Sequence, residues 1–239
     1  MIKFFKRIIT LIIFILVAIL AVFAYDGYEL YQEAITQMSI SQKIEEIKKE
    51  NPNYIKYEEL PKDYINAIVA VEDRRYFEHK GIDLISIARA IVKDIQTMSL
   101  EEGGSTITQQ LAKNTYFTQR KELTRKVAEI FMAFEYEKAC TKEEILELYV
   151  NTIYFGDGYY CVYDASKGYF DKEPKDMNLY ESTLLAGIPN APSVYAPTKN
   201  PELAKERQAQ VLNKMVKFDY LSQEDADNVL EMEFKNLNK

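Results

Sequence analysis

The sequence predicts a mainly α-helical protein that begins with one transmembrane helix. No stretch of the 239 residues sustains the alternation of apolar and polar side chains that is typical of a half-buried strand. Many stretches instead repeat apolar residues at spacings of three and four, which places these residues on one face of a helix. Near the N-terminus, residues 8–24 form an uncharged apolar run.

This apolar run is predicted to anchor the chain in a membrane. As a helix it would be about 26 Å long, which nearly spans a bilayer core of roughly 30 Å. Three basic residues precede it and Asp26 and Glu29 follow it, so the N-terminus is expected in the cytoplasm and the remainder outside. A cleaved signal peptide is the alternative, but the length of the run and the lack of a clear A-x-A site favour an uncleaved anchor in the cytoplasmic membrane.

The remaining chain is predicted to form one globular domain. The expected order is a cytoplasmic tail (1–7), the transmembrane helix (8–24), a stalk that begins a membrane-proximal lobe (25–60), the domain itself (61–218) and a C-terminal helix (219–239). Within the domain and the C-terminal segment, a helix begins near Lys62, and further helical patterns cover 82–98, 109–114, 121–139, 142–151, 164–169, 179–186, 201–218 and 223–234.

Charge and cysteine content exclude two classes of function. The net charge of −7 argues against a general nucleic-acid binder, because phosphate binding is driven by an excess of basic groups. Cys140 and Cys161, with a single histidine in the chain, cannot supply a four-ligand zinc site. Two buried thiols are expected rather than one bridge, although export would permit a bridge.

Glu72 is the first candidate catalytic residue. It follows Ile65, Ile68 and Val69 at helical spacing, so its carboxylate is expected on an apolar face. Burial there disfavours the charged form, which suits a general base. The alternative is a surface acid at a helix end that pairs with Arg74 or Arg75.

Two neighbours of Glu72 are expected to shape the loop that follows it. Asp73 is predicted to orient Glu72 or this loop. His79, seven residues after Glu72, fits a hydrogen-bonded loop brace better than the partner of a nucleophile.

A second candidate segment covers residues 103–114, with the sequence G-G-S-T-I-T-Q-Q-L-A-K-N. Its glycines allow the backbone to come close to a ligand. A basic stretch follows from Lys113 to Lys126, with Glu122 as its only acid. Such cations suit a diphosphate leaving group, whereas the alternative is a solvated helix face. Glu129 lies one turn after Arg125, where a salt bridge is the simplest explanation.

These segments resemble the bacterial peptidoglycan glycosyltransferases of class A penicillin-binding proteins. The order of E-D-R-R-Y-F-E-H-K-G and G-G-S-T-I-T-Q-Q resembles the family's E-D-x-x-F-x-x-H-x-G and G-G-S-T-I-T-Q-Q motifs. R-K-V-A-E at 125–129 and K-E-E-I-L-E-L-Y-V-N at 142–151 resemble the third and fourth motifs. In the fifth motif, R-R-x-x-V-L, Gln208 replaces the second arginine, and Cys161 and Asp171 stand where the family usually has glycine.

The resemblance runs from about Asn66 to Met215 and implies a fold and an activity. The fold would be lysozyme-like, with a head and a small membrane-proximal jaw lobe. The activity would be polymerisation of lipid II into β-linked glycan strands, with inversion and release of undecaprenyl diphosphate. Glu72 and Glu129 would be the catalytic acids. The substrate-binding residues would be Asp73, Ser105, Thr106, Gln109, Gln110, Lys113, Asn114, Lys121, Arg125 and Lys126.

The resemblance also implies partners and leaves alternatives open. Lipid II, the growing strand and the membrane would be partners, together with a separate transpeptidase or division and elongation proteins. No S-x-x-K or K-T-G occurs, so a monofunctional enzyme is expected. No cofactor or metal site is expected, although Mg²⁺ or Mn²⁺ could bridge diphosphate oxygens. The alternatives are a lytic muramidase, against which the basic stretch argues, and a non-catalytic scaffold that binds lipid II.

Overall fold

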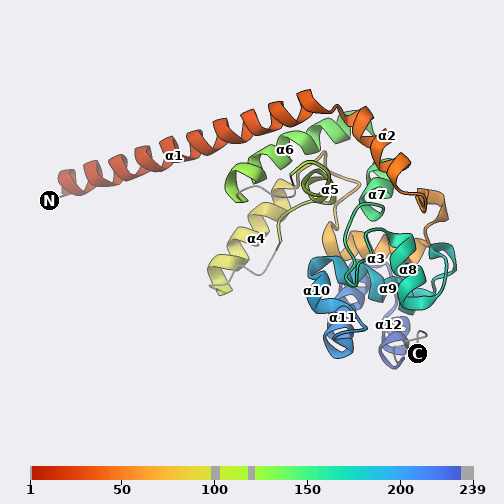
Figure 1. The fold of residues 1–239 in the computed structure, drawn as a ribbon. Helices are drawn as coiled ribbons and strands as arrows, with labels where there is room; N and C mark the ends of the chain where they lie inside the picture. Colours follow the sequence, from red (N-terminus) through yellow and green to blue (C-terminus); the bar gives the residue numbers. More distant parts are fainter. Residues whose placement is uncertain (1, 98–102, 118–121, 233–239) are drawn as a thin grey trace.

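The computed structural model describes residues 2–97, 103–117 and 122–232 (Figure 1). Over these ranges the chain is helical and contains no strand; Lys80 and Ile82 form an isolated bridge. The mainly α-helical fold is therefore confirmed. The α-helices are α1 (Ile2–Gln37), α2 (Ile40–Glu50), α3 (Lys62–Glu72), α4 (Leu84–Thr97), α5 (Ile107–Tyr116), α6 (Glu122–Ala139), α7 (Lys142–Val150), α8 (Val162–Phe170), α9 (Leu179–Gly187), α10 (Pro192–Tyr195), α11 (Pro201–Lys217) and α12 (Gln223–Leu230). Short 3₁₀ turns are η1 (Tyr57–Glu59), η2 (Pro174–Asp176) and η3 (Ile188–Asn190).

The first helix is longer than the apolar run predicts. α1 continues beyond residue 24 to Gln37, and Ser39 then caps α2. Figure 1 shows the N-terminal half of α1 projecting alone from the molecule, while its C-terminal half lies beside α6. Its most apolar window is not buried against the protein, so α1 has the length and composition to cross a membrane.

Part of the predicted stalk belongs to the folded body. The ring of Tyr31 stacks on Phe131 of α6 with centroids 5.5 Å apart, and Leu30 is buried. A Cβ on Gly27 would lie 2.5 Å from Cβ of Val127, so only glycine permits this approach of α1 to α6. The start of the jaw lobe is therefore clamped to α6 rather than extended away from it.

Helix α3 runs through the core and ends at Glu72. Ile68 and Val69 are almost completely buried, as are most residues of the last two turns. α9 and α11 pack against α3, and every residue of α9 from Tyr180 to Gly187 is buried. Figure 1 shows α9 and α11 on one side of α3, and α5 and α6 on the other. The carboxylate of Glu72 thus lies at the end of a firmly packed helix between two groups of helices.

Asp171 and Cys161 stand where the family usually has glycine, and the backbone at each position is one that the residue can adopt. Asp171 ends α8 with φ +55°, a left-handed conformation that Asp tolerates better than most residues. Cys161 has extended backbone, which any residue adopts, and its Sγ accepts the N–H of Asp164 at the start of α8. Both cysteines are unbridged, as predicted. Burial raises the pKa of each thiol to about 11, which keeps both protonated near neutral pH.

The C-terminal helices differ in extent from the prediction. α10 occupies a segment for which no helix was predicted, with Pro192 at its first position, where a missing N–H costs no helix hydrogen bond. α12 ends at Leu230, and residues 233–239 of the predicted C-terminal helix lie outside the described residues.

Candidate active site

A cavity of about 610 Å³ lies where the end of α3 meets α5, α6 and α11. Glu72, Asp73 and Asp83 are the carboxylates among the described residues that line it. The basic side chains of its lining outnumber them: they are Arg74, Arg89, Lys113, Lys126, Arg207, Lys214 and Lys217. An acidic protein therefore holds a cavity rich in positive charge, suited to an anionic ligand.

At this cavity, one carboxylate oxygen of Glu72 is hydrogen-bonded and the other is not. Gln110 Nε2 donates a hydrogen bond to Oε2 at 2.7 Å. The other oxygen, Oε1, is buried and accepts no hydrogen bond within the described part of the chain, although Arg207 Nη2 lies 3.7 Å away. The side chain is only 9% exposed. An oriented carboxylate with an unused oxygen has the geometry of a general base.

A buried tyrosine fixes the orientation of Gln110. Tyr149 of α7 donates its hydroxyl to Gln110 Oε1 at 3.2 Å, which turns the amide N–H₂ toward Glu72. Burial raises the pKa of Tyr149 well above its usual value, so this hydroxyl stays protonated and donates. The segment 142–151, which resembles the fourth motif, thus contacts the site through Tyr149.

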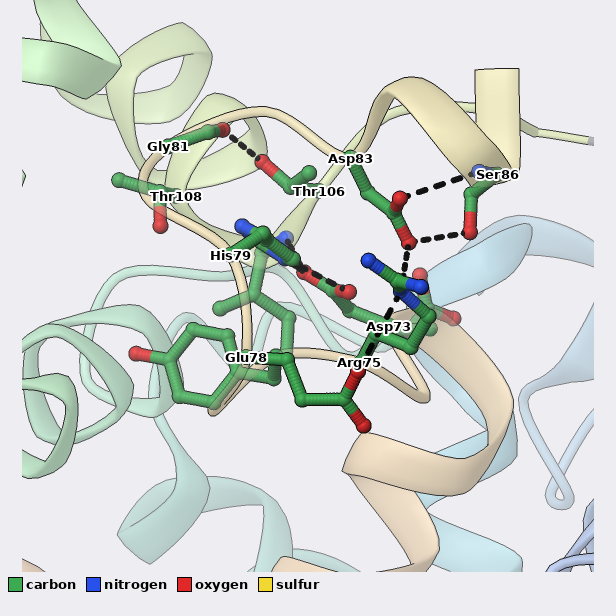
Figure 2. A network of polar contacts seen from close by, with 12 residues as sticks. Asp73, Arg75, Glu78, His79, Gly81, Asp83, Ser86, Thr106 and Thr108 are labelled. Atoms are coloured by element: carbon green, nitrogen blue, oxygen red, sulfur yellow. Dashed lines mark hydrogen bonds and ion pairs between the residues drawn. The ribbon is translucent and has the colours of Figure 1, made fainter. Parts of the chain in front are cut away.

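Asp73 and His79 brace the loop between α3 and α4 (Figure 2). His79 Nε2 lies 3.0 and 2.9 Å from the two oxygens of Asp73, and both side chains are buried. Asp73 Oδ2 also accepts the backbone N–H of Ile107 at 3.1 Å, where α5 begins. The loop-brace prediction for His79 is confirmed, and Asp73 ties the end of α3 to the start of α5.

A second polar contact in this loop fixes the start of α4 (Figure 2). Asp83 accepts hydrogen bonds from Ser86 Oγ at 2.6 Å and from two backbone N–H groups of the first turn of α4, and Arg75 Nε lies 3.2 Å away. Burial by itself raises the pKa of Asp83, but the hydrogen bonds from Ser86 and Ile85 and the charge of Arg75 outweigh it and lower the pKa. Asp83 is therefore a charged N-cap that helps to position α4 beside the cavity.

Tyr76 occupies the position of the phenylalanine in the E-D-x-x-F motif. Its ring is fully buried, and its hydroxyl donates to the carbonyl oxygen of Lys142 at 2.6 Å. The extra hydroxyl is thus satisfied inside the core. The loop is therefore also tied to the start of α7.

Thr106 and Gln109 are placed as helix caps. Thr106 Oγ1 accepts the N–H of Gln109 at 3.1 Å, Gln109 Oε1 accepts the N–H of Thr106 at 3.0 Å, and both side chains are buried. Thr106 Oγ1 also donates to the carbonyl oxygen of Gly81 at 2.6 Å. Thr106 lines the cavity but Gln109 does not, so the described contacts give Gln109 a structural task.

Glu129 holds the two cations that precede it on α6. Its side chain is fully buried, with Arg125 Nε 2.9 Å from Oε1 and Lys126 Nζ 2.7 Å from Oε2. Lys126 Nζ also donates to Ser105 Oγ at 2.8 Å, which links α6 to the segment before α5. The salt bridge predicted between Arg125 and Glu129 is present; its carboxylate is fully buried, whereas the Lys126 side chain is 43% exposed.

The remaining predicted residues fall in different places. Lys113 is exposed and lines the cavity. Asn114 lines a separate cavity of about 400 Å³ with Asn151 and Asp164, so the structure does not bring it to Glu72. Lys121 lies outside the described residues.

Several cavity residues escaped prediction from the sequence. Arg207 approaches Glu72, and its Nε donates to the carbonyl oxygen of Gly187 at 3.3 Å. Lys214 Nζ donates to the carbonyl oxygen of Val71 at 3.0 Å. The spacing of seven puts these two residues on one face of α11, and Arg207 is also the first residue of the fifth motif; these were the available signals. Gln208 is instead buried against α9, where its amide donates to the carbonyl oxygen of Tyr180 at 2.8 Å. Gln208 does not line the cavity, so the replacement of the second arginine of the fifth motif leaves the basic lining of the cavity intact.

The two glycines before α5 are not required by packing. A Cβ on Gly103 would meet no described atom within 4 Å, and one on Gly104 would make ordinary contact with Ile87. Both glycines line the cavity. Their backbone is therefore open to a ligand.

The described residues contain no group of three or more acidic, histidine or cysteine side chains that could hold a metal ion. The buried carboxylate of Glu129 is already paired with Arg125 and Lys126. A dedicated protein cage for Mg²⁺ therefore does not fit the part of the chain described here.

Comparisons with family models and with known proteins agree on one family. A family model described as "Transglycosylase" matches residues 39–216. Penicillin-binding protein 1F of Bacillus subtilis is 40% identical over 234 residues, which cover 92% of this chain and 33% of that protein. A candidate transglycosylase of Cupriavidus necator is 41% identical over 179 residues, which cover 75% of this chain and 77% of the relative.

Among solved structures, penicillin-binding protein 1A from Haemophilus influenzae aligns with a TM-score of 0.45 and 24% identity, over 76% of this chain and 18% of that one. The chain spans a third or less of the penicillin-binding proteins 1F and 1A that it matches among curated proteins. The family model nevertheless covers most of the chain, including both candidate catalytic acids and all the residues that line the cavity except Lys217 and Phe218. The chain belongs to the transglycosylase family.

Proposed function

We propose that this protein is a peptidoglycan glycosyltransferase that polymerises lipid II and releases undecaprenyl diphosphate. One observation carries the proposal: Glu72 offers a buried, unused carboxylate oxygen inside a cavity whose other walls carry lysines and arginines. Family membership supports glycosyl transfer as the reaction class. The lipid II substrate and the roles of the residues are what the resemblance to this family implies, and the basic lining of the cavity supports them.

In the proposed reaction, Glu72 acts as the general base. Its Oε1 accepts the proton of the acceptor sugar's hydroxyl as that hydroxyl attacks the anomeric carbon of the growing strand. Gln110 holds the other oxygen at 2.7 Å, so the carboxylate is oriented before the substrate binds. Attack from the face opposite the leaving group inverts the anomeric centre.

The leaving group is a diphosphate, which departs as an anion and needs no proton. Lys113 and Lys126 line the cavity and would stabilise the charge that develops on it, with Arg125 beside them on α6. Glu129 would act through these cations, because it holds Arg125 and Lys126 from one buried position. Removal of its charge would leave two neighbouring cations without their shared partner.

The predicted transmembrane helix would keep the active site close to the membrane. α1 would cross the cytoplasmic membrane with its N-terminus inside, which would hold the cavity outside, beside the lipid-linked substrate. The same cations argue against a hydrolase, because glycoside hydrolysis needs a protonated acid at the glycosidic oxygen and no site for a diphosphate.

The test is polymerisation of labelled lipid II in detergent by the full chain, beside Glu72→Gln. We expect glycan polymer from the wild type and none from the variant, with binding of lipid II retained by both. Absence of polymer from the wild type despite binding would instead support a scaffold. Release of soluble fragments from preformed glycan would support a hydrolase.

A further inference from the structure

A pair of cations at the rim of the cavity has no assigned task. Arg74 follows the end of α3, and Lys217 is the last residue of α11. The guanidinium carbon of Arg74 lies 5.2 Å from the ring centroid of Phe218, and Lys217 Nζ lies 5.8 Å from the same centroid. All three side chains line the cavity.

This pair is open to a ligand, unlike its basic neighbours. Arg74 and Lys217 are exposed, and neither pairs with a carboxylate in the described part of the chain. Arg207 is instead held by Gly187 and Gln210, and Lys214 by Val71. Two cations gathered on one aromatic ring repel each other, and an anion with two negative charges would relieve this repulsion.

Apart from Arg89 of α4, the basic side chains of the cavity fall into two sets on either side of α3. Lys113 and Lys126 come from α5 and α6, and the pair described here comes from the ends of α3 and α11. Figure 1 shows α11 and the α5–α6 pair on opposite sides of α3, whose last residue is Glu72. The proposed base thus lies between two separate places for an anion.

The stoichiometry of the proposed reaction requires two such places. Each joining step brings together two lipid-linked diphosphates: the donor loses its diphosphate, and the acceptor keeps its own. The set on α5 and α6 is assigned to the departing diphosphate. Resting on the proposed function, we infer that Arg74, Lys217 and Phe218 form the subsite for the diphosphate that the acceptor retains.

The test uses two substrates that each play one part. A lipid II analogue with a methylene group in place of its anomeric oxygen can accept but cannot donate, and lipid II with its attacking hydroxyl blocked can donate but cannot accept. In the double variant Arg74→Gln/Lys217→Gln, the KM of the accepting analogue should rise about tenfold, the usual scale for loss of a charge-assisted contact, with kcat within about twofold. The KM of the donating substrate should stay unchanged.

Two further variants separate this effect from general loss of charge. Lys49→Gln/Lys205→Gln removes the same charge from lysines that do not line the cavity, and both KM values should stay at the wild-type level. Phe218→Leu keeps the cations but removes the ring that gathers them, and should raise the KM of the acceptor by roughly threefold. Thermal unfolding of each variant checks that the fold is intact.

Three results would overturn the inference: an unchanged KM of the acceptor in the double variant, an effect on the donor instead, or an effect that disappears when the acceptor lacks its peptide. The last result would assign the pair to peptide carboxylates. Equilibrium binding of the accepting analogue gives a readout without turnover and should weaken about tenfold in the double variant. If the wild type binds this analogue but forms no product when the donating substrate is also present, the proposed function fails. The binding comparison still decides the subsite in that case.

Discussion

Gln110 Nε2 lies 2.7 Å from Glu72 Oε2, and this contact sets the orientation of the carboxylate on which the proposed chemistry depends. The amide itself is held by the Tyr149 hydroxyl at 3.2 Å, so α3, α5 and α7 meet in one chain of hydrogen bonds. The base is therefore oriented by Gln110 and Tyr149 before any substrate binds. Four predictions follow from this and related contacts.

Tyr149→Phe should lower kcat by several-fold, because the Gln110 amide loses the bond that turns its N–H₂ toward Glu72. Loss of one buried hydrogen bond should also cost about 1 kcal/mol of stability. Tyr136→Phe is the matched control, since this fully buried tyrosine hydroxyl bonds Thr115 at 3.0 Å away from the cavity. Polymerisation rates and thermal unfolding of the two variants separate positioning from stability, and equal kcat values would contradict the proposed positioning.

Glu129→Gln should impair both stability and turnover. A buried carboxylate that pairs with two cations leaves them uncompensated when it is neutralised, which should cost about 3–5 kcal/mol. The value of kcat/KM should fall by about a hundredfold or more, as expected when charge stabilisation of a leaving group is disturbed. Glu135→Gln on the same helix breaks the partly exposed pair with Lys138 but keeps a side-chain oxygen that can accept from Tyr31, so it should cost less than about 1 kcal/mol. Similar behaviour of the two variants would argue against a role for Glu129 at the site.

Asp83 should contribute to the pH dependence of stability. Its pKa is lowered in the folded protein, so its contribution is fully present above the unfolded pKa of about 3.9 and is lost as pH falls through the folded value. Asp83→Asn should therefore be less stable than the wild type at neutral pH, and the difference should shrink below about pH 4. Thermal unfolding from neutral pH to pH 3 in detergent measures it. A difference that stays constant over this range would refute the assignment.

Two glycines should respond to alanine in opposite ways. Gly27→Ala places a Cβ 2.5 Å from Val127 and should destabilise the contact between α1 and α6 by about 1–3 kcal/mol, with partial rescue by Val127→Ala. Gly103→Ala meets no described atom within 4 Å, so stability should stay unchanged while kcat/KM falls, because the methyl group is added to backbone that lines the cavity. Thermal unfolding and polymerisation assays distinguish the two effects. A Gly103→Ala variant with full activity would show that the ligand does not approach this backbone.

The sequence by itself determined the helical class, the apolar anchor, and the place of Glu72 at the end of a buried helix. These features depend on local periodicity, because spacings of three and four fix which side chains share a helix face. The structure shows that Thr106 and Gln109 cap α5. It also shows that His79 contacts Asp73. The T-x-x-Q spacing of Thr106 and Gln109 is itself the sequence pattern of a capping box.

Only the tertiary structure decided which cations face Glu72. Lys126 of α6 and Lys214 of α11 lie far apart in the sequence, and the packing of α9 and α11 on one side of α3, with α5 and α6 on the other, places both groups on one cavity. The same packing turns Asn114 toward a different cavity and buries Gln208 against α9. Local pattern sets the face of each helix, but the distance between faces is set by how the core side chains fill the space between helices.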